Sequence, residues 1–215
     1  MKKTVYFVRH GETSANLEKI WQDGSDELSS EGVRQAQRVA KRVAGLNLDF
    51  ALTSSMKRAV DTAQAIAHEA NLEFTESDLF IEARVPTETV GQKFVEEDGN
   101  ICFEYIKARS EHKLDSHFRY SDEETLAELY FRAKEALAYL DAIDAENIVV
   151  VTHGTFLRML INTVLHQEVT DNPFIIFSAG RNMQTTNTGM SVIHKMTPDN
   201  NWSVLTFNDQ AHFAE

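Results

Sequence analysis

A short apolar run that ends in Arg9-His10-Gly11 constrains the fold of this chain more than any other stretch of its sequence. Residues 4–8 are mostly β-branched or aromatic, which is typical of a strand buried on both faces. The glycine indicates that the backbone turns there and leaves room for a ligand. In an open α/β sheet, ligands bind beyond the carboxyl ends of the parallel strands. The sequence therefore predicts an imidazole and a guanidinium held on a rigid support at a ligand-binding edge.

The same arrangement recurs later in the chain, where the apolar run at residues 147–152 ends in His153-Gly154. If the two strands are neighbours in the sheet, His10 and His153 face one cavity. The alternative is that His153 belongs to the start of a helix and that its ring donates a hydrogen bond to a backbone carbonyl.

A third strand end carries another basic residue. Thr53-Ser54-Ser55-Met56-Lys57-Arg58-Ala59 leads from a predicted strand into a predicted helix. The free N–H groups and the dipole of a helix N-terminus favour an anion, and Arg58 lies one turn inside that helix. The alternative is that Arg58 is an exposed helix charge. If Arg9, Arg58, His10 and His153 do converge, only an oxyanion relieves their mutual repulsion, so the sequence predicts a phosphate pocket.

The alternation of strands and helices favours a parallel sheet with right-handed crossovers. We expect an α/β fold with three layers, in which an open, mostly parallel sheet has helices on both faces and a small inserted cap. We expect a polar loop at 17–27, an extended segment that ends at 79–82 and a helix that begins at Ser29 or Ser30 and ends near Gly45. Further helices are predicted at 56–69 and 123–142 and after Gly154, and strands at 4–8, 49–53, 147–152, 174–178, 190–195 and 202–207.

A length of 215 residues suits a single domain that spans residues 1–215. Residues 84–122 show no dominant period but contain several aromatic side chains. Linkers lack such aromatic content, so we interpret this segment as a partly helical cap inserted within the domain.

Composition excludes several classes of function. The net charge of −12 argues against a nucleic-acid-binding or anionic membrane surface, which requires a basic patch. Cys102 is the only cysteine, which excludes an intrachain disulfide and a cysteine-based metal cage. The N-terminal apolar run is too short for a signal peptide, and no run reaches the ~20 residues of a membrane span. We therefore expect a soluble, cytoplasmic protein. The sequence carries no signal for its oligomeric state.

The three strand ends together resemble the histidine phosphatase superfamily, the phosphoglycerate-mutase-like proteins. Arg9-His10-Gly11-Glu12-Thr13 with Asn16 resembles the first histidine motif of that family, and Val151-Thr152-His153-Gly154 resembles the second. The segment 53–59, with Thr62-Ala63 beyond it, resembles the arginine motif between them. The resemblance covers most of residues 4–165 by motif, whereas the cap matches nothing specific.

The resemblance implies a chemistry for these residues. His10 attacks phosphorus to form a phosphohistidine that water then hydrolyses, while Arg9, Arg58 and His153 bind the phosphoryl group. Asn16 helps to hold that group, and Asn187-Thr188-Gly189 is a weaker candidate for backbone contacts. The implied substrate is a small phosphorylated molecule, with no cofactor and no metal.

Glu82 is the candidate that protonates the leaving oxygen, because it matches the segment that carries the acid in the family. Glu88 and Glu12 are its rivals. Many family members continue with a glycine after this acid, whereas this chain continues Ala83-Arg84-Val85-Pro86-Thr87-Glu88, which is closer to some bacterial phosphatase-like members.

Three functions stay open at this point. The first is a phosphatase of small phosphomonoesters. The second is a phosphoglycerate mutase, which the cap disfavours because it has no adjacent pair of arginines and its cations are scattered among acids: Lys107, Arg109, Lys113 and Arg119. The third is a non-catalytic module that binds phosphorylated ligands. No H-E-x-x-H or similar ligand spacing supports a metal-dependent hydrolase.

Overall fold

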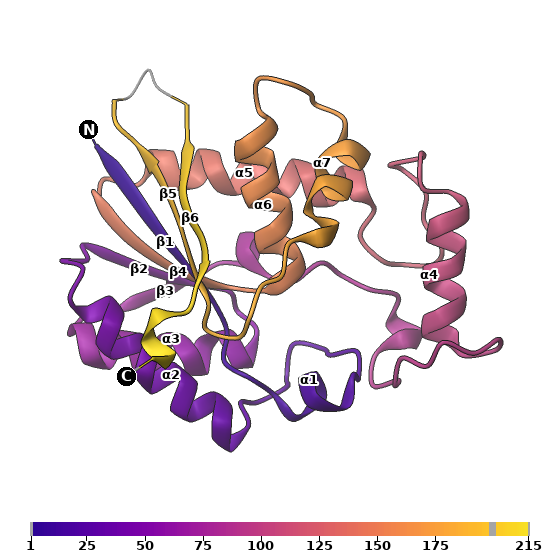
Figure 1. The fold of residues 1–215 in the computed structure, drawn as a ribbon, viewed down its shortest axis with the longest axis horizontal. Coiled ribbons are helices and arrows are strands. Elements are labelled where there is room, and N and C mark those ends of the chain that lie inside the picture. The colour runs from indigo at the N-terminus through magenta and orange to yellow at the C-terminus, as the bar shows by residue number, and fades with distance from the viewer. Residues whose placement is uncertain (1, 198–200, 215) are drawn as a thin grey trace.

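The computed structural model describes residues 2–197 and 201–214. These residues form a six-stranded sheet with the order β3-β2-β4-β1-β5-β6 and with helices on both faces (Figure 1). The strands are β1 (Lys3–Arg9), β2 (Phe50–Thr53), β3 (Phe74–Glu76), β4 (Asn147–Thr152), β5 (Met190–Lys195) and β6 (Ser203–Asp209). The helices are α1 (Ser14–Glu18), α2 (Ser30–Ala44), α3 (Lys57–Ala70), α4 (Ile101–Glu111), α5 (Leu126–Ala142), α6 (Gly154–His166) and α7 (Pro173–Ala179).

The central strands run parallel. β4 pairs in parallel with β1 on one side and with β2 on the other, and β3 continues this direction beyond β2. β5 and β6 add an antiparallel edge beyond β1. The predicted open, mostly parallel α/β sheet is confirmed. Because β1, β4 and β2 run in the same direction, their carboxyl ends meet at one edge of the sheet.

Two apolar layers hold the helices against the sheet. On one face, α2 and α3 pack through small and β-branched side chains against Val8, Val149 and Val151. On the other face, α5, α6 and α7 pack against Phe7, Ile148 and Val150 with larger side chains. The strands alternate between these two layers, which explains why they read as continuous apolar runs.

One helix begins after a capping residue that the sequence predicts, and a second begins three residues later than predicted. The Ser29 side chain accepts a hydrogen bond from the backbone N–H of Gly32 at the start of α2. Thr125 and Glu128 form a reciprocal capping box at the start of α5, within the predicted range 123–142.

Three predictions of local structure are wrong. Residues 174–178 belong to helix α7 and not to a strand, because Asn172 caps the helix and Pro173 occupies its first turn. The segment at 79–82 is not a strand end, since Asp78–Phe80 forms a 3₁₀ turn that Ser77 caps. The polar stretch at 17–27 begins inside the short helix α1, which Thr13 caps.

Residues 84–122 lie outside the sheet, and α4 stands apart from the helices that cover it (Figure 1). Tyr105 of α4 is buried and contacts Trp21 and Tyr120 edge-on or tilted, with ring centroids 5.5 and 5.7 Å apart. The aromatic residues of this segment thus form packing contacts with one another and with the loop after α1. That the segment is a cap inserted within a single domain stays a prediction.

Candidate active site

The two histidines predicted at strand ends lie side by side. His10 follows β1 and His153 follows β4, and the backbone N–H of His10 donates to the Thr152 carbonyl at 2.9 Å. Their ring centroids are 5.0 Å apart. Both rings are almost completely removed from solvent, with exposures of 3% and 0%. The structure therefore brings the two histidines together at the carboxyl edge of the sheet.

The hydrogen bond of His10 fixes which ring nitrogen carries the proton. Nδ1 lies 2.7 Å from the carbonyl oxygen of Gly11, which can only accept, so Nδ1 carries the hydrogen in the neutral ring. Burial, reinforced by the charges of Arg58 and Arg9, lowers the pKa of His10 well below its ordinary value. The ring is therefore neutral near pH 7, and Nε2 presents an unprotonated lone pair.

His153 is held through its other nitrogen. Its Nε2 lies 2.7 Å from the Ser54 hydroxyl, while the same hydroxyl oxygen accepts the N–H of Met56 at 3.2 Å. Nδ1 of His153 is buried and has no hydrogen-bond partner. Burial, and then the neighbouring His10, lowers the pKa of His153 well below its ordinary value. The residue stands at the N-cap position of α6, but its ring does not bond to a carbonyl as the alternative interpretation required.

Both predicted arginines reach the same place. Arg58 is 2% exposed, and its Nη1 donates to the Asp23 carbonyl at 2.5 Å. Arg9 donates from Nη1 to the Thr185 carbonyl at 2.5 Å. Each guanidinium keeps a buried Nε–H without a partner. Burial lowers the pKa of both side chains, with Glu82 the main opposing influence. Arg58 is therefore not an exposed helix charge.

The unpartnered donors gather at one point of the molecule. Among the described residues, four buried side-chain nitrogen or oxygen atoms lack a hydrogen-bond partner, and three of them belong to Arg9, Arg58 and His153. Buried polar groups are nearly always paired, so three unpaired donors beside one another indicate a binding site for an acceptor. No carboxylate in the described part of the chain forms an ion pair with Arg9 or Arg58.

Asn16 lies at the rim of this pocket. Its side-chain oxygen accepts hydrogen bonds from the N–H of Thr13 and from Nδ2 of Asn187, both at 3.2 Å. Asn187 also donates to the carbonyl of His10 at 3.0 Å. Asn16 is thus held by the loop before β5, which borders the backbone of the histidine motif.

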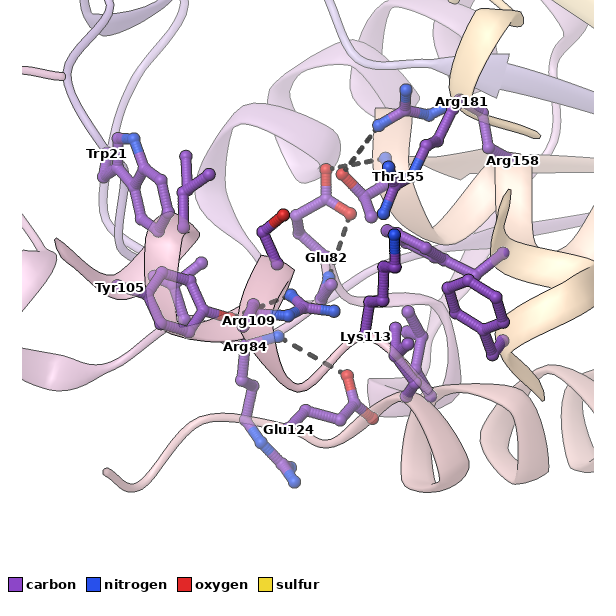
Figure 2. Close-up of a pocket in the computed structure, with 18 residues that line it drawn as sticks. Trp21, Glu82, Arg84, Tyr105, Arg109, Lys113, Glu124, Thr155, Arg158 and Arg181 are labelled. Carbon is purple, nitrogen blue, oxygen red and sulfur yellow. Dashed lines mark hydrogen bonds between the residues drawn. The ribbon is translucent and has the colours of Figure 1, made fainter. Parts of the chain in front are cut away.

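Glu82 faces the pocket from the end of the 79–82 segment. Its Oε1 accepts the N–H of Ala83 at 2.9 Å and its Oε2 accepts the N–H of Thr155 at 3.0 Å (Figure 2). Oε1 also accepts the N–H of Phe156 at 2.8 Å. The carboxylate therefore sits at the N-terminus of α6, where the helix dipole favours an anion. The rivals lie elsewhere: Glu88 accepts from the Ser121 hydroxyl on the surface, and Glu12 accepts from Ser29.

Sequence reasoning missed the residue that holds the backbone before this carboxylate in place. Arg132 of α5 donates from Nη1 to the carbonyls of Leu79 at 3.0 Å and Ile81 at 2.9 Å. It also forms a buried ion pair with Glu124 at 2.7 Å and lies over the Phe156 ring at 4.2 Å. No sequence pattern singles out this arginine, because its partners are backbone carbonyls about fifty residues away.

Two cavities meet at Glu82. The first, of about 410 Å³, is lined by Arg9, His10, Asn16 and Arg58 together with residues of the loop after α1. The second, of about 510 Å³, extends from Glu82 between α4, α6 and α7 (Figure 2).

Among the described residues no group of three or more His, Cys, Asp or Glu is arranged to hold a metal ion. Within the same residues, no helix is both long and apolar enough to span a bilayer.

Comparison with known proteins identifies the family that this arrangement represents. The profile of the histidine phosphatase superfamily (branch 1) matches residues 5–210. The chain belongs to the histidine phosphatase superfamily. Phosphoglycerate mutase-like protein 4 of Arabidopsis thaliana is 32% identical over 98% of this chain and 87% of its own length. Probable phosphoglycerate mutase GpmB of Serratia proteamaculans is 29% identical over 97% of this chain and 94% of its own length.

Solved structures of two phosphatases have the same fold. A putative alpha-ribazole-5'-P phosphatase from Escherichia coli superposes with a TM-score of 0.79 at 19% identity, covering 96% of both chains. A phosphoserine phosphatase mutant from Entamoeba histolytica, solved in complex with phosphoserine, superposes with a TM-score of 0.72 at 25% identity, covering 98% of both chains.

Proposed function

We propose that this histidine phosphatase superfamily member hydrolyses small phosphomonoesters through a phosphohistidine on His10. The observation that carries the proposal is the set of buried donors without partners on Arg9, Arg58 and His153, beside a neutral imidazole. Phosphoryl transfer spreads negative charge over three equatorial oxygens, and fixed positive charges and N–H donors stabilise that charge.

In the first step, the lone pair on Nε2 of His10 attacks phosphorus. The hydrogen on Nδ1 stays bonded to the Gly11 carbonyl, which holds the ring in its plane as the bond forms. The guanidinium groups of Arg9 and Arg58 and Nδ1–H of His153 bind the phosphoryl oxygens, and Asn16 supports the rim. The bond between phosphorus and the leaving oxygen breaks.

Glu82, which takes up a proton when the phosphate group of the substrate binds beside it, gives that proton to the leaving oxygen. Oε2 accepts only one backbone N–H, whereas Oε1 accepts two, so Oε2 has the free position that carries the proton. In the second step, water attacks the phosphohistidine and gives a proton to Glu82. The electron pair of the P–N bond returns to Nε2, which releases inorganic phosphate.

Hydrolysis of an aryl phosphate in the presence of a chelator tests this proposal. We expect turnover in the wild type and its loss in His10→Ala, with the binding of inorganic phosphate retained. The phosphoserine phosphatase to which the chain is similar supports a small monoester as the substrate. Phosphate binding without any turnover would instead favour a non-catalytic module.

A phosphoglycerate mutase is the second candidate, because relatives that match nearly the whole chain have that name and because the cavity beside Glu82 is rich in cations. The two activities are separated by incubation with 3-phosphoglycerate. Release of inorganic phosphate without accumulation of 2-phosphoglycerate supports the phosphatase, whereas interconversion much faster than hydrolysis supports the mutase.

A further inference from the structure

The cavity beside the phosphoryl pocket is the larger of the two that meet at Glu82. It measures about 510 Å³, within the range of cavities that hold small-molecule ligands. Trp21, Glu82 and Ala83 line both cavities. A leaving group whose oxygen takes its proton from Glu82 therefore stands at the entrance to this second cavity.

The lining of the second cavity is strongly cationic although the chain carries a net charge of −12. Arg109 lies on α4, Lys113 follows that helix, Arg158 lies on α6 and Arg181 lies in the turn after α7, and all four side chains line the cavity (Figure 2). Arg84 also borders the cavity, but its side chain points away (Figure 2).

None of these four cations is neutralised by the part of the chain that the structure describes. No ion pair is formed by Arg109, Lys113, Arg158 or Arg181. Two carboxylates line the cavity, and both are already engaged. Glu124 is paired with Arg132 at 2.7 Å, and Glu82 accepts backbone N–H groups of α6. Four unpaired cations around one cavity repel one another, and a bound anion would relieve that repulsion.

The walls of the cavity are aromatic. Trp21, Tyr105, Phe174 and Phe177 line it, and the guanidinium of Arg109 lies 5.5 Å from the ring centroids of both Tyr105 and Phe177. Arg109 also donates to the Tyr105 hydroxyl at 2.9 Å. These contacts join α4 to α7 across the cavity and hold one cation in a fixed position. Flat apolar groups pack well against such walls.

We propose that the second cavity binds the leaving group of the substrate and that this group combines a flat apolar body with a second oxyanion, a carboxylate or a phosphate. The proposal rests on the proposed phosphatase function, because it assigns the leaving oxygen to Glu82. The apolar body lies against the aromatic walls, and the second oxyanion is bound by Arg109, Lys113, Arg158 and Arg181.

The test uses phenyl and biphenyl phosphates in three forms: unsubstituted, with a carboxylate at the far end of the ring system, and with a second phosphate there. We expect kcat/KM in the wild type to be at least about tenfold higher for a compound with a second anionic group than for its unsubstituted parent. The preferred anion and ring length distinguish a carboxylate from a phosphate. Equal values across the series, or a preference for the unsubstituted parent, would overturn the proposal.

Arg109→Met with Lys113→Met removes two of the cations and keeps much of their apolar volume. We expect the preference, which is the ratio of the two kcat/KM values, to fall by about tenfold, and a cooperative urea-unfolding transition like that of the wild type to show that the variant folds. Arg181→Gln is a second, milder variant that we expect to reduce the preference by about threefold. Lys107→Met is the matched control, since Lys107 lies on α4, does not line the cavity and pairs with Asp98. A preference that survives in the double variant would overturn the proposal.

The two proposals fail in different ways. If no aryl phosphate is hydrolysed, the proposed phosphatase function is wrong. Calorimetric titration with the matching non-hydrolysable phosphonates still measures binding to the second cavity. Tighter binding of the phosphonate with a second anionic group to the wild type, lost in the double variant, then supports the cavity proposal alone. Equal affinity for both phosphonates contradicts it.

Discussion

Replacing Glu82 by glutamine tests the proposed proton donor at nearly constant volume. A glutamine oxygen in the place of Oε1 still accepts the N–H groups of Ala83 and Phe156. In the wild type, the N–H of Thr155 donates to Oε2 at 3.0 Å, whereas in the variant it faces the amide nitrogen, which cannot accept it. The variant therefore loses one hydrogen bond to a charged group, about 1.5–3 kcal/mol, and a helix-dipole interaction of about 0.3–1 kcal/mol. We expect it to be about 2–4 kcal/mol less stable, so it is assayed well below its unfolding midpoint.

The catalytic effect of Glu82→Gln depends on the leaving group. General acid catalysis contributes about 10²–10⁴-fold, so we expect kcat/KM for an alkyl phosphate to fall by that factor. Nitrophenolate leaves without a proton, so the first step with 4-nitrophenyl phosphate changes little. Because Glu82 also serves as the base for water, the second step becomes slow. Stopped-flow absorbance then shows a burst of one nitrophenolate for each enzyme molecule, followed by slow turnover.

Glu88→Gln is the matched control, because Glu88 is an exposed carboxylate six residues further along the chain that bonds to Ser121. We expect wild-type kinetics from it on both substrates. The reasoning is refuted if Glu82→Gln hydrolyses the alkyl phosphate within about threefold of the wild-type rate, or if Glu88→Gln shows the larger loss.

Three further predictions follow from the packing around the site. Histidine in the unfolded chain takes up a proton near pH 6.5, whereas burial lowers the pKa of His10 and His153 and keeps both rings neutral in the folded state. The free energy of unfolding should therefore fall as pH drops below about 6.5, by up to ~1.4 kcal/mol per pH unit for each histidine. Urea unfolding across pH 5 to 8 measures this loss, and an equally steep loss in His10→Gln would contradict it. A Cβ on Gly32 would lie 2.0 Å from the Glu12 carbonyl oxygen, so Gly32→Ala should lower the free energy of unfolding by about 1–3 kcal/mol. Thermal unfolding measures this loss, and an unchanged midpoint would contradict it. Arg132→Leu leaves the buried Glu124 without its ion-pair partner, so we expect the free energy of unfolding in chemical denaturation to fall by about 3–5 kcal/mol. Adding Glu124→Gln should restore much of that stability. No recovery would argue against an unpaired charge as the cause.

The sequence predicted the parts of the fold that depend on local signals. The apolar runs before His10 and His153 are strands because their apolar side chains alternate between the two apolar layers on either face of the sheet. The helix after Ser29 begins at its capping residue. At residues 174–178, β-branched and aromatic side chains suggested a strand, but Asn172 and Pro173 start a helix there. The cap and the proline therefore decide the local structure, and the β-branched composition of the run does not.

The convergence of His10, His153, Arg9 and Arg58 was expected from strand ends that meet at one edge of a parallel sheet. The cations of the second cavity were not expected, because they come from α4, α6 and the turn after α7. Arg109 and Lys113 appeared scattered among acids along the chain. Arg109 lies on α4 and Lys113 follows the end of that helix, and only the placement of this segment opposite Phe177 of α7 brings Arg158 and Arg181 to the same cavity.

The central claim is that three buried donors hold a phosphoryl group against Nε2 of His10. Rapid mixing with an aryl phosphate, quenching in alkali and mass spectrometry of the peptides test it most directly, because phosphohistidine survives alkaline quenching. The account predicts a transient addition of one phosphoryl group on the peptide that contains His10, absent in His10→Ala and longer-lived in Glu82→Gln. Turnover with no labelled His10 in either the wild type or Glu82→Gln, or label on a different residue, would contradict it.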